Sequence, residues 1–82
     1  MASRSEYAEV VGGRLRAARG DRPATEIAGL LGITTATLYR WETGSIVVPH
    51  ERFGEVADVL DASWDELFAP AAAVDSLPYE VA

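Results

Sequence analysis

The chain has 82 residues, of which 49% are hydrophobic, and it carries a formal net charge of −6 and no Cys. This length suits one small domain, and this hydrophobic content is too high for a wholly disordered chain. The composition excludes disulfide bonds and thiolate metal sites, and no apolar run approaches the ~18 residues that a membrane span needs. The first ten residues lack the apolar core of a secretory signal, so we expect a cytoplasmic protein with no membrane partner.

The charges are unevenly distributed along the chain. Residues 1–52 contain seven Arg and six acidic residues, whereas residues 53–82 contain seven acidic residues and no base. The acidic balance argues against non-specific binding to nucleic acid, but it is compatible with a local face that carries Arg. Because a guanidinium group binds phosphate or guanine bidentately, such a face would favour specific contacts.

A first helix is predicted from the amino-terminal residues to about Arg19. Ser3 and Glu6 form the S-x-x-E pattern of a capping box, which marks a helix start. Gly12-Gly13 weakens this helix by roughly 1 kcal/mol per Gly relative to Ala. Its inward positions, spaced by three or four residues, are Tyr7, Val11, Leu15 and Ala18.

A second helix is predicted to follow a short break at residues 20–22. Pro23 suits the first position of this helix, and Gly32 suits the residue that ends it after Leu31. The expected buried residues of this helix are Ile27, Ala28 and Leu31.

The third predicted helix has two faces of different character. Thr34 is a suitable N-cap, and the helix is expected to end near Glu42, before Gly44. At ~100° per residue, Leu38 and Trp41 share the inner side. The outer side carries Thr35, Ala36, Tyr39 and Arg40, a set that indicates contact with a partner.

Two further helices are predicted before the character of the chain changes. Pro49 suits the start of a fourth helix that ends near Leu60, with Phe53, Val56, Ala57 and Leu60 inward. Ser63 and Glu66 form a second capping box, which begins a short fifth helix through Phe68. Two Trp and two Phe are expected to help fill the core.

Residues 70–82 are predicted to lie outside the folded domain at 1–69. They contain two Pro and two acidic residues and show no helical periodicity. One interpretation is a solvated, flexible tail. The other is a dimer arm that packs on a second subunit through Leu77, Tyr79 and Val81.

Residues 11–68 resemble the XRE, or Cro/phage-repressor-like, helix-turn-helix family. The segments that carry the resemblance are "GRLRAAR" at 13–19, "EIAGLLGITTATLYRWETG" at 26–44 and "VLDASWDELF" at 59–68. The resemblance implies an all-α, five-helix repressor-like domain with a helix-turn-helix and a short C-terminal tail. It also implies a regulator of transcription that binds double-stranded DNA, typically as a repressor and as a homodimer.

The resemblance assigns roles to particular positions, and no cofactor is implied. The residues expected to read bases in the major groove are Thr35, Ala36, Tyr39 and Arg40. The residues expected to contact phosphates are Thr25, Thr37, Arg22 and Arg14. Arg19 and Glu42 are expected to form a structural ion pair between the first and third helices.

The chain departs from the family pattern near these sites. Ala24 stands where the family usually has a Gln that contacts phosphate. The loop after Gly44, usually polar and basic, reads "SIVV". Residues 46–48 are therefore expected to form a small apolar patch that fills the core, contacts DNA sugars or binds a protein.

Three alternative functions follow from other features of the sequence. Residues 32–44 followed by Pro49 faintly resemble the start of a MerR-like DNA binder, which requires a wing strand soon afterwards. A protein-binding control module, of the antitoxin or phage anti-repressor type, would use the acidic half with the patch at 46–48 or the tail. An enzyme is not expected, because the single His50 has no evident catalytic or metal-ligand neighbours.

Overall fold

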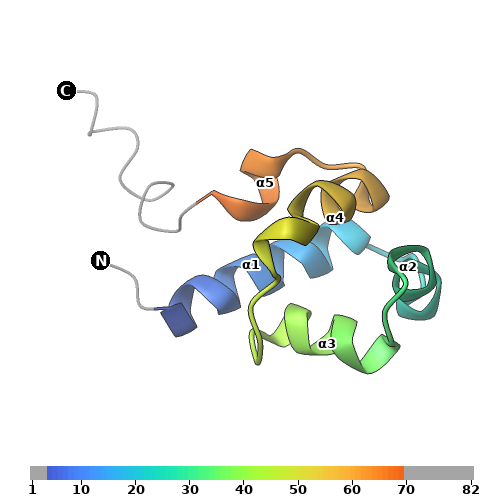
Figure 1. Cartoon of the computed structure of the whole chain (residues 1–82), viewed down its shortest axis with the longest axis horizontal. Helices are drawn as coiled ribbons and strands as arrows, with labels where there is room; N and C mark the ends of the chain where they lie inside the picture. Colours follow the sequence, from blue (N-terminus) through green and yellow to red (C-terminus); the bar gives the residue numbers. More distant parts are fainter. Residues whose placement is uncertain (1–3, 70–82) are drawn as a thin grey trace.

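The computed structural model describes residues 4–69, with side chains from Glu6 onward. This part of the chain is all-helical and contains no strand, which confirms the predicted fold class. Its elements are α1 (Arg4–Arg19), α2 (Ala24–Leu31), α3 (Thr35–Thr43), the 3-10 turn η1 (His50–Arg52), α4 (Phe53–Leu60) and α5 (Trp64–Phe68). Figure 1 shows α1 in the middle of the domain, between α3 on one side and α4 and α5 on the other.

Most helix ends lie where the sequence places them, because short-range hydrogen bonds fix them. Gly32 adopts a left-handed conformation with φ 70°, and the N–H of Ile33 donates to Ala28 O at 3.0 Å. Ser63 and Glu66 form the expected capping box, with reciprocal bonds of 2.9 and 3.1 Å. These local interactions end α2 and begin α5 independently of the rest of the fold.

Pro23 and Pro49 each lie just before the helical segment that they were expected to begin. Pro23 is the N-cap of α2 and precedes its first residue, because its ψ of 138° is extended. Pro49 precedes η1, so a 3-10 turn separates it from α4. The capping box expected at Ser3 lies outside the described residues.

The core is built from α1 to α5, and it includes the tryptophan of α3. Trp41 is only 3% exposed and contributes to a cluster with Leu15, Ile27 and Leu38. Trp64 is 49% exposed, so the expectation that both tryptophans fill the core is wrong for this residue. The side chain of Trp64 instead lies over Phe53 in a T-shaped contact with 5.6 Å between ring centroids.

The loop that follows α3 is divided between core and surface. Val48 is 3% exposed and belongs to the core, whereas Ile46 is 43% exposed. The expected three-residue apolar patch therefore shrinks, because one of its members serves as a core residue.

The helices α1 and α3 approach each other closely at Gly12. A Cβ atom at Gly12 would meet the carbonyl oxygen of Glu42 and would lie 2.6 Å from that of Trp41. From the sequence alone, this glycine is expected only to weaken the helix. In the fold it allows α3 to lie directly on α1, and this contact sets the position of the outward face of α3.

Candidate nucleic-acid interface

The segment from α2 to α3 is a compact helix-turn-helix whose inner sides are buried. Ile27, Ala28 and Leu31 of α2 are at most 3% exposed, as expected, and Leu38 of α3 is 2% exposed. The turn between the helices holds only three residues, 32–34. Thr34 Oγ1 accepts from the N–H of Thr37 at 3.1 Å, so α3 begins at a defined residue.

The outward face of α3 presents the four residues expected to read bases. Ala36, Tyr39 and Arg40 are exposed, and Thr35 is partly exposed. Tyr39 keeps 50% of its surface accessible, and the guanidinium of Arg40 has no partner within the described side chains. This face carries a hydroxyl, a methyl, a phenol and a cation within about one and a half helical turns.

Arg19 and Glu42 join α1 to α3 through a two-pronged ion pair, as the family resemblance implies. Arg19 Nε donates to Glu42 Oε2 at 2.7 Å, and its Nη2 donates to Oε1 at 3.0 Å. The side chains are 14% and 4% exposed. The hydrogen bond to Glu42 raises the pKa of Arg19 above its usual value. A third bond, from Arg19 Nη1 to Arg22 O at 2.9 Å, ties the pair to the turn before α2.

Replacement of the carboxylate in this pair is expected to destabilise the fold. Glu42→Gln leaves the cation of Arg19 largely buried without a counter-charge, and we expect a loss of about 2 kcal/mol. The loss stays below that of a fully buried pair, because Arg19 keeps its bond to Arg22 O. Urea denaturation followed by circular dichroism measures this free energy.

The matched control for this substitution is Glu55→Gln. Glu55 also pairs with an arginine, Arg52, but its side chain is 51% exposed. An exposed pair contributes about 0–1 kcal/mol, so this variant should unfold almost as the parent does. Equal losses for the two variants would contradict the structural role of Glu42.

Three arginines donate to carbonyl oxygens at the carboxyl ends of helices. Arg14 Nη1 donates to Ala69 O at 2.7 Å, just after α5. Arg22 Nη1 donates to Val59 O in α4 at 3.2 Å, and Arg52 Nη1 donates to Leu31 O in α2 at 2.8 Å. These positions favour cations, because the last carbonyls of a helix have no partner within it.

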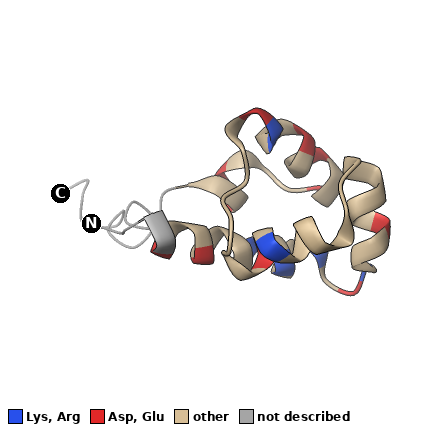
Figure 2. Ribbon diagram, turned by 60° about the horizontal axis from the view of Figure 1, so that its bottom comes forward, with Lys and Arg blue, Asp and Glu red and all other residues tan. Residues whose placement is uncertain are grey.

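These bonds limit which arginines of the candidate interface can turn toward a phosphate. Arg14 and Arg22, both expected to contact phosphates, donate to these carbonyl oxygens through Nη1 alone, and these bonds fix the direction in which each guanidinium points. Of the six arginines with described side chains, only Arg16 and Arg40 have guanidinium groups without a hydrogen bond or ion pair. Figure 2 accordingly shows blue segments scattered over the ribbon rather than one continuous basic face.

The other phosphate candidates are two threonines at helix starts. Thr25 is exposed in the first turn of α2, where no side chain caps the helix. Thr37 is partly exposed, and its Oγ1 shares a hydrogen bond of 2.9 Å with Thr34 Oγ1. Arg16, an exposed residue of α1, is a further cation suited to a phosphate.

Comparisons with known proteins agree with this geometry. A family model described as a helix-turn-helix domain matches residues 10–70. The chain belongs to the helix-turn-helix family. This match confirms the resemblance derived from residues 11–68.

The fold of this helix-turn-helix domain is also similar to a solved structure. The crystal structure of the DNA-binding domain of BldD superposes with a TM-score of 0.68 and 26% sequence identity. The similarity covers 83% of this chain and 99% of that chain. The comparison with curated proteins gave no match.

Other kinds of site find no support within residues 4–69. The wing strand of a MerR-like fold is not present there, since η1, α4 and α5 follow Pro49. None of the described helices has the length and apolar character needed to cross a membrane. The described side chains also include no group of three His, Asp or Glu that could hold a metal ion.

Proposed function

We propose that this helix-turn-helix domain binds specific sequences of double-stranded DNA and regulates transcription, with α3 in the major groove. The observation that carries the proposal is the exposed face of α3, which is held rigidly by the close approach at Gly12 and by the Arg19–Glu42 pair. A rigidly positioned helix with an unpartnered Arg is what base readout requires. Family membership and the likeness to the DNA-binding domain of BldD support this proposal.

Each residue of the outward face of α3 has chemistry that suits a base edge. Arg40 is proposed to donate to guanine O6 and N7, since guanidinium is bidentate and no protein group competes for it. Thr35 suits a base edge or a phosphate, and Ala36 suits the methyl group of thymine. Tyr39 is proposed to contact the neighbouring base.

Phosphate contacts in this proposal come mainly from helix starts. The first turn of α2, with Thr25, and the hydroxyl of Thr37 are suited to phosphate oxygens. Arg14 and Arg22 remain candidates through the N–H groups that do not donate to carbonyl oxygens, in the orientation that the Nη1 bonds impose. The contribution of phosphate contacts to affinity should therefore be small, and binding to random DNA should be weak.

Dimerisation is part of the proposal. A single domain with few unpartnered cations presents too little surface for tight specific binding, whereas two copies on a two-fold related site double the contacts. We also infer a non-enzymatic protein of the cytoplasm, which suits a regulator that acts on DNA.

Selection of binding sites from random duplexes with the purified protein tests the proposal. We expect one enriched motif with two related half-sites separated by about one helical turn, 10–10.5 base pairs. Recovery of no motif at low salt would contradict sequence-specific binding. A single half-site would contradict the dimer.

Arg40→Ala is expected to weaken binding to the selected site by roughly 1–3 kcal/mol and to relax preference at one base position. The loss arises because guanine O6 and N7 would lose their donor. Thermal stability should change little, since Arg40 is exposed and unpartnered. Fluorescence anisotropy with matched and single-base-changed duplexes measures both effects.

Arg16→Ala is the matched control, because Arg16 is the other unpartnered arginine but lies on α1. Its removal should leave the base preference unchanged. An Arg40→Ala loss that is equal on specific and random duplexes would reassign Arg40 to a phosphate.

A further inference from the structure

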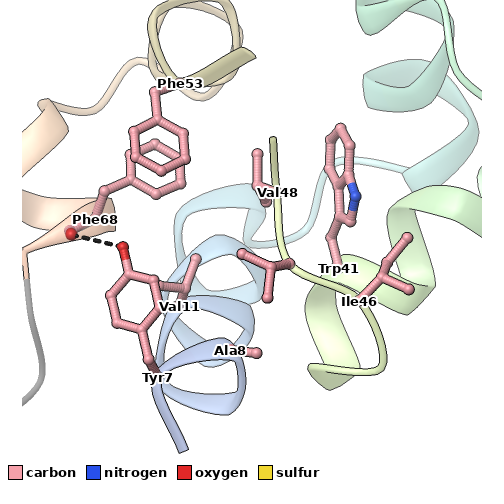
Figure 3. A pocket seen from close by; sticks show the side chains of 9 residues that line it. Tyr7, Ala8, Val11, Trp41, Ile46, Val48, Phe53 and Phe68 are labelled. Carbon is pink, nitrogen blue, oxygen red and sulfur yellow. Dashed lines mark hydrogen bonds between the residues drawn. The ribbon is translucent and has the colours of Figure 1, made fainter. Parts of the chain in front are cut away.

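A column of aromatic rings leads from the core to the surface of the domain. Phe68 is buried, and its carbonyl oxygen accepts from Tyr7 OH at 2.9 Å. Its ring lies parallel to that of Phe53 with 3.8 Å between centroids, as Figure 3 shows. Trp64 forms a T-shaped contact with Phe53, and its own surface is 49% exposed. The exposed indole is therefore held by contacts that begin in the core.

The indole of Trp64 is also held from the side of η1 and α4. The ring of His50 meets it in a second T-shaped contact, with 5.9 Å between centroids. A Cβ atom at Gly54 would lie 3.8 Å from Cζ2 and Nε1 of the indole, so the indole lies against the first turn of α4. An aromatic side chain that is already held in place loses little entropy when a partner binds it. Exposed tryptophans of this kind suit the centre of a protein interface.

Carboxylates surround this indole. Asp58 lies one turn beyond Gly54 on the same side of α4, and Asp61 follows it at the end of that helix. Asp65 is the next residue after the tryptophan, and Glu51 lies in η1. These four carboxylates are exposed and have no partner among the described side chains. The indole and the four carboxylates together are called the Trp64 surface.

The arginine of this region does not neutralise the Trp64 surface. Residues 50–69 contain six acidic residues and a single Arg. Arg52 donates to Leu31 O at 2.8 Å and to Glu55 Oε1 at 3.0 Å, so its guanidinium is directed toward α2 and its charge is already paired. The Trp64 surface therefore combines an accessible aromatic face with uncompensated negative charge.

These charges decide among the candidate occupants of the Trp64 surface. DNA is a polyanion, so the carboxylates would repel it. A second copy would bring a surface of like charge, and residues 70–82 of the same chain contain two acidic residues and no base. A guanidinium group, in contrast, both stacks on an indole and binds carboxylates.

We propose that the Trp64 surface binds an arginine-rich segment of another protein. Guanidinium groups of this segment stack on the indole and donate to the surrounding carboxylates. Figure 1 shows α4 and α5 across α1 from α3, so the occupied surface leaves the outward face of α3 open. The domain then recruits a basic protein partner in addition to its proposed contact with DNA.

An NMR titration with a capped peptide of alternating Arg and Ala tests the proposal. The ¹⁵N-labelled protein is titrated at low salt and without DNA, because DNA would itself bind the peptide. We expect saturable shifts of the indole N–H of Trp64 and of the amides of Gly54 and Asp58. The amides of α3 should not move. No shift of the three named signals, or equal shifts throughout the domain, would overturn the proposal.

Trp64→Leu tests the role of the aromatic ring. This variant keeps an apolar side chain but removes the indole, and it should weaken peptide binding about tenfold, as the loss of an interface hot spot does. The shifts at Gly54 and Asp58 measure the affinity, and circular dichroism verifies that the variant is folded. An affinity equal to that of the parent would overturn stacking on Trp64.

Asp58→Asn combined with Asp61→Asn tests the carboxylates. Asn suits the left-handed conformation of residue 61, whose φ is 55°. We expect peptide binding to weaken about three- to tenfold. The matched control, Asp21→Asn with Glu26→Gln, removes the same charge from exposed positions outside the Trp64 surface and should bind as the parent does. Equal losses would mean that net charge alone attracts the peptide, and they would overturn the assigned surface.

Two further measurements identify other occupants. The parent and Trp64→Leu should have the same mass in sedimentation equilibrium, whereas a lower mass for the variant would show that a second copy covers the indole and would overturn the proposal. Titration with the selected duplex should shift amides of α3 and leave the indole N–H of Trp64 in place. A shift of the indole signal would assign this surface to DNA instead. A duplex that moves no signal would refute the proposed function and leave the peptide result standing.

Discussion

Trp41→Ala is expected to lower the free energy of unfolding by about 3–5 kcal/mol, enough to unfold much of a domain this small. The indole is 3% exposed and packs in the core on the inner side of α3. Its removal leaves a cavity that the rigid contact between α1 and α3 at Gly12 prevents from closing. Thermal and urea denaturation followed by circular dichroism measure the loss.

Trp64→Ala is the control for this substitution. Trp64 is 49% exposed and contacts mainly His50 and Phe53 at the surface. We expect a smaller loss of roughly 1 kcal/mol, because about half of the Trp64 surface stays in water and it buries far less than Trp41 does. If Trp41→Ala melts as the parent does, the inner face of α3 is wrongly assigned.

Gly12→Ala is expected to destabilise the domain by about 3 kcal/mol, although alanine is the better helix former. The added Cβ meets the carbonyl oxygens of Trp41 and Glu42, and backbone atoms cannot move aside as a flexible side chain can. The α1 and α3 helices must therefore separate, which loosens the Arg19–Glu42 pair as well. Denaturation measures the loss, and DNA affinity should fall at temperatures where the variant stays folded.

Gly13→Ala supplies an internal comparison one residue away. No atom lies within 4 Å of a Cβ at Gly13, and the residue is exposed in the same helix. This substitution should stabilise the domain by roughly 0.5–1 kcal/mol. A loss of stability for Gly12→Ala together with a gain for Gly13→Ala would identify the contact between α1 and α3 as the cause. A gain of stability for both substitutions would contradict this explanation.

The sequence predicts best what short-range chemistry determines. Thr34, Gly32 and Ser63 set helix ends through bonds that span three to five residues, so these ends are readable from the chain itself. The inward residues of α2 and α3 follow from periodicity and are buried as expected. The exact start of α2 could not be predicted from Pro23, because a proline suits both the N-cap and the next position.

The features that the sequence does not predict depend on contacts between residues far apart in the chain. A five-residue helix such as α5 has too short a pattern to indicate which side Trp64 occupies. The close approach at Gly12 depends on α3, about 30 residues later in the chain, so nothing near Gly12 reveals it. The partners of Arg14 and Arg22 are carbonyl oxygens, which every residue carries and no motif marks. The base-reading and phosphate assignments remain predictions.

The arginine bonds to helix carboxyl ends also bear on how the domain folds and unfolds. Arg14 joins residues 55 positions apart, Arg22 joins residues 37 apart and Arg52 joins residues 21 apart. Such contacts form only after the helices have met, whereas the caps of α3 and α5 form within one turn. Arg22→Ala should therefore speed unfolding and leave the folding rate almost unchanged in stopped-flow experiments. These three guanidinium groups would then govern the lifetime of the folded state.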